Sequence, residues 1–338
     1  MSRGYGCPMA RVPLSILDLA PVPEGTTSAA ALQASEALAV RADELGFHRY
    51  WVAEHHNLAW VASTEPAVLM AHLAARTSQI RLGSGGVMLP NHTPLVVAEQ
   101  YALLEALHPG RIDLGIGRAP GTDRHTAVAL RRQTDGSEDE EFPRHLLELM
   151  ALLGDDRTGA DVASHLRATP QAMTSPSIFL LGSSPFSAQL AGLLGLPYAF
   201  AHHFDMGGTG RAADIYREHF RPSPVLDEPH LLVTAVAVAA ASAEHAEYLL
   251  GPHRLVKYGM RTGRMFGLLP TEQAHAHPAM ADAATMDINF VAGPGEVVAE
   301  GLEKLVAEFD AAEVMITVSA LDIADRIDSI ERLAAAWS

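Results

Sequence analysis

Short runs of aliphatic and β-branched residues alternate along the chain with longer segments whose apolar residues recur at helical spacing. The short runs predict eight β-strands, at residues 14–19, 50–53, 80–89, 112–117, 178–181, 198–201, 230–238 and 313–317. The longer segments predict helices at residues 28–45, 66–77, 94–107, 143–153, 185–194, 210–219, from about 243, and at 324–336. A strand–helix unit that recurs along a chain indicates parallel strands covered by helices.

The boundaries of several predicted helices are marked by residues that favour helix starts. Ser28 is the predicted N-cap of the first helix, and Pro66, Pro94 and Pro185 stand where three others begin. Proline is tolerated in the first helical turn because its missing N–H would have no helical partner there. Eight such units in 338 residues predict a closed (β/α)₈ TIM barrel that forms one domain over residues 1–338. An open, doubly wound parallel sheet is the alternative.

Two segments interrupt this pattern. Residues 133–141 (QTDGSEDEE) are acidic and predict a loop after the fourth strand. Residues 251–289 are rich in His, Met, Gly and Pro and have no clear period, which predicts an insertion in the barrel near residues 250–290. Long insertions at the carboxyl side of a barrel are usually functional. We therefore predict that residues 251–289 form a lid that is poorly packed without substrate, with a solvated linker as the alternative.

The charge and cysteine content narrow the possible partners and location. The formal net charge of −16 would repel nucleic acid and anionic membranes. A single cysteine, Cys7, excludes a disulfide within the chain. The first residues lack the apolar run of a signal peptide, and the apolar stretch 231–241 is too short to cross a bilayer. We expect a soluble cytoplasmic protein with neither a nucleic-acid nor a membrane partner.

The residues that directly follow the predicted strands are the candidates for chemistry, because TIM barrels build their active sites on these loops. Histidines and other polar residues are frequent there. The positions are occupied by Asp18, Glu54, His55, His56, Asn57, Asn91, His92, Arg118, Ser183, Ser184, Ser187, His202 and His203. The predicted substrate pocket is lined by Asp18, His92, Gly117, His202 and His203.

A phosphate-binding site is predicted where the fifth strand leads into its helix. Ser183 and Ser184 precede Pro185, and Ser187 lies in the first turn. The free N–H groups and the positive dipole at a helix N-terminus suit a phosphate, and serine hydroxyls add donors. Arg118, at a neighbouring position on the rim, would supply a fixed charge. A purely structural N-cap at Ser184 is the alternative.

The histidine pair and the glycine run give weaker indications. On an extended chain His55 and His56 point to opposite sides, so they are poor candidates to bind one metal, while Glu54 shares a side with His56. Since HExxH and cysteine clusters are absent from the sequence, we predict no metal site, and without a GxSxG elbow a serine triad is also unsupported. The GSGG run at 83–86 indicates either close approach to a ligand or a strand bulge.

Four motifs, in this order and spacing, carry a resemblance to a known family. They are WVAEHHN, IRLGSGGVMLPNHTPLVVAEQ, HPGRIDLGIGR and LLGSSPFSAQLAGLLGLPYAF. Together with FVAGPGEVV at 290–298, they resemble the bacterial luciferase-like flavin-dependent monooxygenases. The resemblance covers most of residues 12–220 and leaves residues 250–289 uncovered. Within the family, the chain is more similar to tailoring-type oxygenases, such as that of mensacarcin biosynthesis, than to the light-emitting subunits.

The resemblance implies an activity and its partners. Reduced FMN (FMNH₂) from a separate flavin reductase would react with O₂ to give a C4a-peroxyflavin that oxygenates a small organic substrate. It also implies a homodimer formed through helices near the rim. Two alternatives stay open: an F420- or FMN-dependent dehydrogenase or reductase on the same barrel, and a non-catalytic flavin-binding barrel. The sequence has no GxGxxG after its first strand, which agrees with dependence on a separate reductase.

The resemblance also implies a role for each matching residue. The flavin phosphate would be bound by Arg118, Ser183, Ser184 and Ser187. Gly85–Gly86 matches a non-proline cis peptide beneath the isoalloxazine ring, and Ala53 borders the flavin. His55 matches a histidine beside the reactive face and is the predicted catalytic acid/base, with a packing role as the alternative.

Two positions depart from the light-emitting enzymes. Gly117 stands where those enzymes carry a cysteine, and Ala53 stands where they carry a larger residue. The resemblance therefore implies no light emission and a wider pocket, and it leaves the substrate open.

Overall fold

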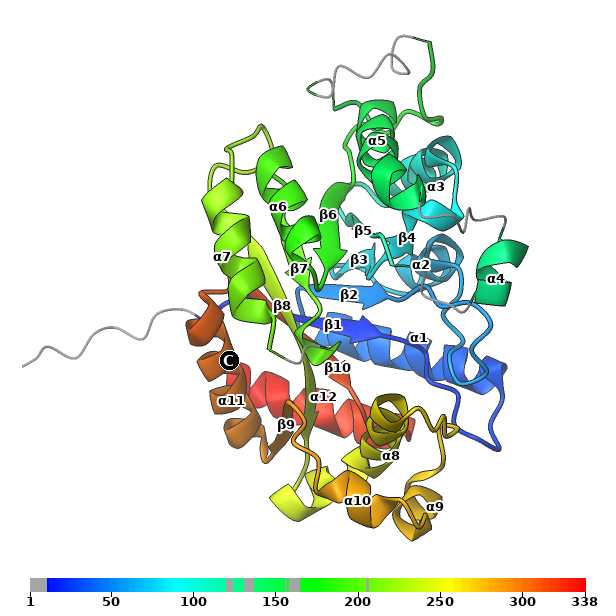
Figure 1. The fold of residues 1–338 in the computed structure, drawn as a ribbon, viewed down its shortest axis with the longest axis vertical. Helices are drawn as coiled ribbons and strands as arrows, with labels where there is room; N and C mark the ends of the chain where they lie inside the picture. The colour runs from blue at the N-terminus through cyan, green and yellow to red at the C-terminus, as the bar shows by residue number, and fades with distance from the viewer. Residues whose placement is uncertain (1–10, 120–123, 131–136, 156, 158–164, 205–206) are drawn as a thin grey trace, which may run out of the picture.

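The computed structural model describes the chain except for residues 1–10, 120–123, 131–136, 156, 158–164 and 205–206. Its centre is a closed barrel of eight parallel strands (Figure 1). The barrel strands are β1 (Leu14–Asp18), β2 (Arg49–Val52), β3 (Arg81–Ser84), β5 (Ile112–Gly117), β6 (Ser177–Gly182), β7 (Tyr198–Phe200), β8 (Leu231–Ala239) and β10 (Glu313–Val318). β10 pairs with both β1 and β8 and so closes the ring. The predicted TIM barrel is confirmed, and the open-sheet alternative is wrong.

Helices surround the barrel (Figure 1). They are α1 (Ser28–Glu44), α2 (Pro66–Ala74), α3 (Pro94–Leu107), α4 (Arg124–Ala129), α5 (Ser137–Leu152), α6 (Pro185–Leu194), α7 (Thr209–His219), α8 (Ala243–Thr262), α9 (Thr271–Ala276), α10 (Met280–Ala284), α11 (Gly295–Phe309) and α12 (Ile323–Trp337). Proline opens α2, α3 and α6 as predicted. The N-cap of α1 is Thr27 instead of Ser28, with its hydroxyl accepting the Ala30 N–H. In the described part of the chain, each helix is too short or too polar to cross a membrane.

Three strand and loop boundaries differ from the predictions. The third predicted strand is divided into β3 and the short β4 (Val87–Met88), with a cis Gly85–Gly86 peptide bond between them. An additional strand, β9 (Phe290–Gly293), pairs with the C-terminal residues of β8, from Val236 to Ala239. The acidic segment is not a loop throughout, because α5 begins at Ser137; residues 133–136 and Cys7 lie outside the described residues.

The insertion is the main correction to the predicted fold. Residues 251–289 contain the second half of α8 together with α9 and α10. Leu255, Ala274, Met280 and Ala283 are buried together and form a small core of their own. The predicted poorly packed segment is therefore wrong. Its helices are short and its apolar side chains meet across three of them, so the sequence of any one helix shows little periodicity.

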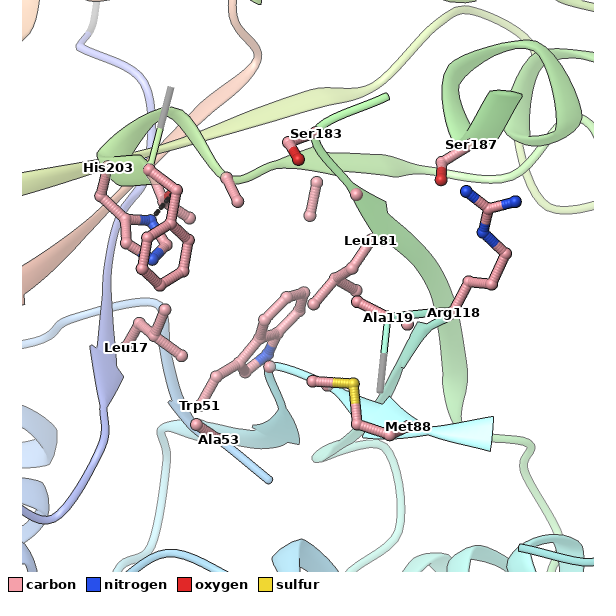
Figure 2. A pocket seen from close by; sticks show the side chains of 18 of the residues that line it. Leu17, Trp51, Ala53, Met88, Arg118, Ala119, Leu181, Ser183, Ser187 and His203 are labelled. Atoms are coloured by element: carbon pink, nitrogen blue, oxygen red, sulfur yellow. Dashed lines mark hydrogen bonds between the residues drawn. The ribbon is translucent and has the colours of Figure 1, made fainter. Parts of the chain in front are cut away.

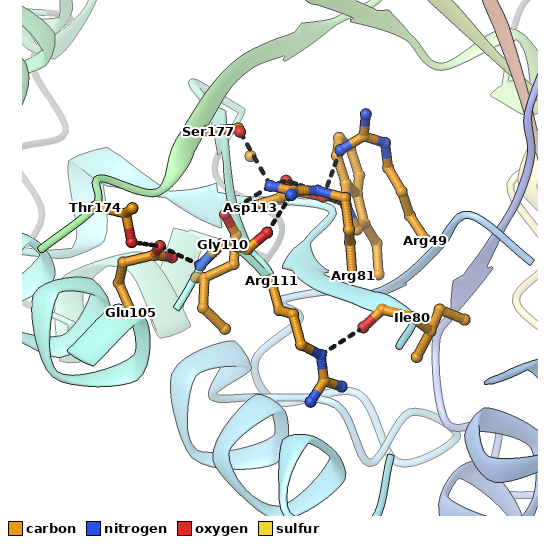
Figure 3. Close-up of polar contacts among 12 residues, drawn as sticks. Arg49, Ile80, Arg81, Glu105, Gly110, Arg111, Asp113, Thr174 and Ser177 are labelled. Atoms are coloured by element: carbon orange, nitrogen blue, oxygen red, sulfur yellow. Dashed lines mark hydrogen bonds and ion pairs between the residues drawn. The ribbon is translucent and has the colours of Figure 1, made fainter. Parts of the chain in front are cut away.

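A buried ion network lies at the end of the barrel where the strands begin (Figure 3). Arg49 Nη1 is 2.7 Å from Asp113 Oδ2, and Arg49 Nε is 2.9 Å from Glu313 Oε1. Arg81 Nη2 approaches the other oxygen of Asp113 at 2.6 Å. Ser15 donates to Glu313 at 2.5 Å. Four strands, β1, β2, β5 and β10, are thus joined across the barrel interior, with β3 contributing Arg81.

The buried groups of the network keep one another ionised. Burial opposes ionisation of Arg49, but Asp113 and Glu313 hold its pKa above the ordinary value. Burial likewise raises the pKa of Glu313, but the nearby His230, Arg49 and Ser15 outweigh burial and leave the pKa below the ordinary value. Both carboxylates are fully buried. The charges therefore depend on one another, because each is isolated from water.

Trp51 connects this network to the middle of the barrel. Its indole N–H donates to Asp113 Oδ2 at 3.1 Å, and its ring meets Phe179 edge to face at 5.0 Å. A side chain at Gly83 would place its Cβ 2.4 Å from Trp51 Nε1, so the glycine leaves room for the indole. This explains one glycine of the GSGG run through side-chain packing.

We predict that Arg49→Met lowers the free energy of unfolding by about 3–5 kcal/mol, because it leaves two buried carboxylates without their shared cation. Urea unfolding at pH 7 measures this. Arg76→Met is the matched control, since Arg76 is 59% exposed and pairs with Glu36 at the surface; it should cost less than about 1 kcal/mol. Equal costs for the two variants would contradict the structural role of Arg49.

We predict that the stability lost in Glu313→Gln decreases as the pH falls. A carboxyl whose folded-state pKa is depressed contributes stability above its ordinary pKa, which is 4.5 for Glu313, and that stability disappears as the pH drops through the folded value. Unfolding curves of wild type and variant between pH 7 and pH 3 give the difference, which narrows only once the pH falls to about 4.5 and below. Glu303→Gln, at a side chain 44% exposed, is the control. A pH-independent difference for Glu313→Gln contradicts the assignment.

Candidate active site at the carboxyl ends of the strands

A cavity of about 260 Å³ lies at the end of the barrel opposite the ion network, with Trp51 between them (Figure 2). Its wall combines residues from the loops that follow β2, β3, β5, β6 and β7. Ten residues singled out from the sequence line it: Ala53, His55, Gly85, Gly86, Gly117, Arg118, Ser183, Ser184, Ser187 and His203. The topology therefore gathers residues that are up to 150 positions apart in the chain into one wall.

One end of the cavity is polar and is formed by the start of α6. Ser184 is the N-cap, and its hydroxyl accepts the Ser187 N–H at 3.4 Å. Ser187 is buried and lines the cavity, with its Oγ 3.4 Å from Ser184 Oγ. A Cβ at Gly182 would lie 2.4 Å from Ser187 Oγ, so the glycine makes space for this hydroxyl. Ser184 thus caps the helix and lines the cavity at the same time.

Arg118 completes the polar end. It follows β5, and its guanidinium lies over the ring of Phe186 at 4.7 Å from the ring centre. Figure 2 shows Arg118 and Ser187 side by side at this end. A stacked guanidinium, serine hydroxyls and a helix N-terminus together favour an anion such as a phosphate.

Much of the remaining cavity wall is apolar. Trp51, Leu17, Met88 and Leu181 border it (Figure 2). The cis Gly85–Gly86 bond lies in this part, and its presence agrees with the geometry that the family resemblance implies. An elongated ligand with an anionic group at one end and a flat apolar group at the other matches this distribution of polar and apolar surface.

The two adjacent histidines after β2 point to opposite sides, as predicted. His55 lines the cavity. His56 faces Glu54, with 3.0 Å between His56 Nε2 and Glu54 Oε1. Glu54 is fully buried behind the cavity and also accepts the Met88 N–H at 2.9 Å and the Asn91 amide at 3.0 Å. Glu54 therefore anchors the loops after β2 and β4.

His92 does not line the cavity, contrary to its predicted place in the substrate pocket. Its Nε2 lies 2.9 Å from Glu54 Oε1. Burial lowers the pKa of His92, but the Glu54 carboxylate outweighs burial and leaves that pKa above the ordinary value. Polar atoms of Glu54, His56 and His92 lie within 4.8 Å of one another, a spacing that a metal ion could use, and they already hydrogen-bond within the group.

Asp18 lies beside the cavity and binds three neighbouring groups. Its carboxylate lies 2.6 Å from Arg326 Nη2, accepts the Tyr50 hydroxyl at 2.6 Å and accepts the Ala20 N–H at 3.0 Å. It borders a chamber next to the cavity instead of the cavity itself. Burial raises its pKa, but Arg326 and the hydrogen bonds keep the pKa below the ordinary value. The Asp18 carboxylate therefore holds the side chains of Arg326 and Tyr50 and the backbone at Ala20 in place.

The two histidines after β7 separate because the chain turns there in a short 3₁₀ helix, His202–Phe204. His202 lies 2.7 Å from Thr209 Oγ1 and packs against Phe309, in a different surface groove, so its predicted place in the pocket is wrong. His203 lines the cavity. Its Nδ1 is 2.5 Å from Thr234 Oγ1, whose proton goes to the Phe200 carbonyl at 3.1 Å.

The hydrogen bonding of Thr234 determines which ring nitrogen of His203 carries the proton. Because the hydroxyl proton is used on Phe200, Thr234 accepts the Nδ1–H of His203, and Nε2 is the unprotonated nitrogen of the neutral ring. Burial, together with Lys257, lowers the pKa of His203 to about 3. A neutral imidazole beside the cavity is thus built into the fold. Thr234 lies inside a continuous apolar strand, and its sequence context offered no signal for this role.

A second chamber, also of about 260 Å³, adjoins the cavity. The two share the wall residues Leu17, Leu19, His55, His203 and Phe204. The rest of the chamber is mostly apolar and includes Leu58, Trp60, Val61, Val236, Met260, Met265 and Leu268. Part of the wall comes from α8 and the segment that follows it. The insertion therefore belongs to the site, although it is a packed wall.

Comparison with known proteins gives the family. The family model described as luciferase-like monooxygenase matches residues 12–333. A luciferase-like monooxygenase of Escherichia coli (strain K12) is 41% identical over 327 residues, 95% of each chain. N-acetyl-S-alkylcysteine monooxygenase of Bacillus subtilis (strain 168) is 37% identical over 307 residues, 90% of this chain and 91% of that one. The crystal structure of apo-MsnO8 has a TM-score of 0.89 at 38% identity, covering 97% of this chain and 98% of its own.

Two more distant structures share the fold only. The oxygenating constituent of 3,6-diketocamphane monooxygenase from Pseudomonas putida, in complex with FMN, has a TM-score of 0.73 at 18% identity, covering 96% of this chain and 97% of that one. An F420-dependent secondary alcohol dehydrogenase with an F420–acetone adduct has a TM-score of 0.69 at 15% identity, covering 97% and 99%. The family match and the relatives above 30% identity span nearly the whole chain. The chain therefore belongs to the luciferase-like monooxygenase family and is an enzyme of the monooxygenase class.

Proposed function

We propose that this chain is the oxygenase of a two-component system that uses reduced FMN and O₂ to oxygenate a small organic substrate. The observation that carries the proposal is the distribution of polarity in the cavity, with Arg118 and the α6 serines at one end and Trp51 beside Gly85–Gly86 at the other. FMN has the same distribution, with a phosphate at one end and a flat ring at the other. A fold neighbour is described in complex with FMN.

The residues of the cavity fit the cofactor at both ends. Arg118, Ser183, Ser184 and Ser187 would hold the phosphate, and the Ser187 hydroxyl fits at this end of the cavity because residue 182 is a glycine. Ala53, Gly85 and Gly86 would border the ring. A Cβ at Gly86 would lie 2.7 Å from the Gly115 carbonyl oxygen, so the neighbouring β5 backbone leaves no room for a side chain at this position of the cavity wall.

When bound, reduced FMN would supply the electrons that activate O₂, so that one oxygen atom would enter the substrate and the other would leave as water. The protein's own contribution is to orient the reactants, exclude water and move protons. The apolar part of the cavity excludes water from the reacting groups. His55 borders both the cavity and the chamber and is the proposed acid/base. His203 offers a neutral imidazole beside it.

The substrate would occupy the adjoining chamber, which meets the cavity at His55. One relative is named for action on N-acetyl-S-alkylcysteines, which agrees with a small organic substrate. Gly117 lines the cavity without a side chain, and light emission is no part of the proposal. We further propose that a separate flavin reductase delivers the reduced cofactor, that the enzyme works in the cytoplasm without a metal, and that it is a homodimer.

One alternative function has support from a solved structure. A dehydrogenase with the same fold is described with an F420–acetone adduct, and hydride transfer of that kind needs no O₂. Anaerobic incubation with reduced or oxidised F420 and with FMN distinguishes the two. Substrate-dependent bleaching of F420 without O₂ would favour a dehydrogenase, and FMN binding without oxygen uptake on any substrate would favour a non-catalytic flavin-binding barrel.

We expect oxygen uptake and an oxygenated product when the protein is combined with FMN, NADH and a generic flavin reductase and tested against thioether, aldehyde, alkane and aromatic substrates. His55→Gln should lower kcat by roughly 10²–10⁴-fold, the range for one general acid or base, and change FMN affinity much less. His56→Gln is the matched control, because His56 faces Glu54 behind the cavity. Equal turnover of wild type and His55→Gln would remove His55 from the chemistry.

We expect Arg118→Ala to weaken FMN binding by about 1.5–3 kcal/mol, which is the range for a hydrogen bond to a charged group. Quenching of flavin fluorescence measures the affinity. Arg76→Ala, at the exposed surface of the barrel, is the control and should leave it unchanged. Riboflavin, which lacks the phosphate, should bind wild type and Arg118→Ala equally. A similar loss for riboflavin would place Arg118 away from the phosphate.

A further inference from the structure

Three buried polar atoms without a hydrogen-bond partner meet on one wall of the adjoining chamber. They are His253 Nδ1, Ser319 Oγ and Arg326 Nε. In the part of the chain that the structure describes, seven buried side-chain atoms lack a partner, and these three all belong to residues that line this chamber. A buried polar atom left unsatisfied costs about 1–3 kcal/mol. Three such atoms on one wall indicate that a polar group of a ligand forms the missing hydrogen bonds.

The wall is assembled from three separate elements. His253 lies on α8, Ser319 directly follows β10, and Arg326 lies in the first turn of α12. Ser319 and Arg326 are each only 2% exposed. Asp18 accepts a hydrogen bond from Arg326 Nη2, and Arg326 Nε is a buried donor without a partner. The polar groups of this wall are therefore enclosed by protein.

Lys257 adds a charge to the same wall. It lies one turn after His253 on α8, lines the chamber, and donates to the His203 carbonyl at 2.7 Å. Burial lowers the pKa of Lys257 to about 8, so the side chain is mainly cationic at neutral pH. The ammonium group has two further N–H groups besides the one used on His203.

The charges on the chamber wall do not cancel. Asp18 neutralises Arg326, and burial lowers the pKa of His203 to about 3 and that of His253 to about 4, which leaves both rings neutral at pH 7. Lys257 then gives the wall a positive excess inside a chain whose net charge is −16. The rest of the chamber lining is mostly apolar and includes Leu58, Trp60, Val61, Met260 and Leu268.

We propose that the chamber selects an organic acid, with its carboxylate on the wall of Lys257, Ser319 and Arg326 and its apolar body toward His55. A carboxylate has one negative charge and two acceptor oxygens, which matches one excess positive charge and several unused donors. The identification of this acid as the substrate rests on the proposed function. Its binding in the chamber can be measured without any flavin chemistry.

The test compares two probes that have the same apolar body and differ in their polar end. Isothermal titration of the full-length protein with 3-phenylpropanoate and with 3-phenylpropan-1-ol at pH 7 should show tenfold or tighter binding of the acid. Lys257→Met should lower acid affinity tenfold or more and leave alcohol affinity unchanged. Lys304→Met is the matched control, because Lys304 is the other lysine of the chain and is exposed on α11; it should bind both probes like wild type.

The alcohol also reports on folding. If Lys257→Met still binds 3-phenylpropan-1-ol, its chamber is intact, and a loss of acid binding alone supports the proposal. Should that variant fail to bind either probe, Ser319→Ala, a change of one hydroxyl, takes its place and should weaken acid binding selectively. Equal affinity of wild type for acid and alcohol, or binding of neither at millimolar concentration, overturns the proposal.

Failure of the proposed function has a different signature. Acid selectivity together with no FMN binding and no oxygen uptake would refute the flavin monooxygenase and leave the acid site standing. Oxygen uptake with neutral substrates, together with equal affinity for the two probes, would do the reverse.

Discussion

The ion network of Arg49, Asp113 and Glu313 is the interaction on which the rest of the site depends. It joins strands that are remote in sequence at the base of the barrel, where water cannot replace a lost partner. Asp113 also fixes the indole of Trp51, whose ring lies at the floor of the cavity. The barrel thus has an ionic layer below, an aromatic layer in the middle and a binding cavity above. A change in the lowest layer would reach the cavity through Trp51.

The rim repeats the same principle, since its buried carboxylates are used to hold loops. Glu54 binds groups from the segments after β2 and β4, and Asp18 binds Tyr50 and Arg326. Because these acids are saturated with donors, their pKa values lie below the ordinary range and they remain ionised. They are therefore poor proton donors and good anchors. The groups left over for chemistry are those that face the cavity.

The sequence was sufficient to predict the barrel, because strand runs and helix starts recur and local patterns such as Pro185 after the serines report directly on backbone geometry. It also predicted ten residues of the cavity wall, because residues after parallel strands must meet at one rim. It failed where a side chain's direction depends on distant partners. His92 turns to Glu54, and His202 turns outward on a 3₁₀ helix. Likewise the packing of residues 251–289 depends on contacts between short helices.

Unpaired buried polar atoms distinguish side chains that bind a ligand from side chains that only hold the fold together, and they do so better than residue type does. Asp18 and Arg326 form a buried ion pair, and yet the Nε–H of Arg326 has no hydrogen-bond partner. That N–H, the hydroxyl of Ser319 and the ammonium of Lys257 are the donors that remain for a ligand. A wall that was only structural would be expected to pair its donors with nearby acceptors. The excess of unpaired donors and positive charge on this wall therefore favours a partner that accepts hydrogen bonds and carries negative charge.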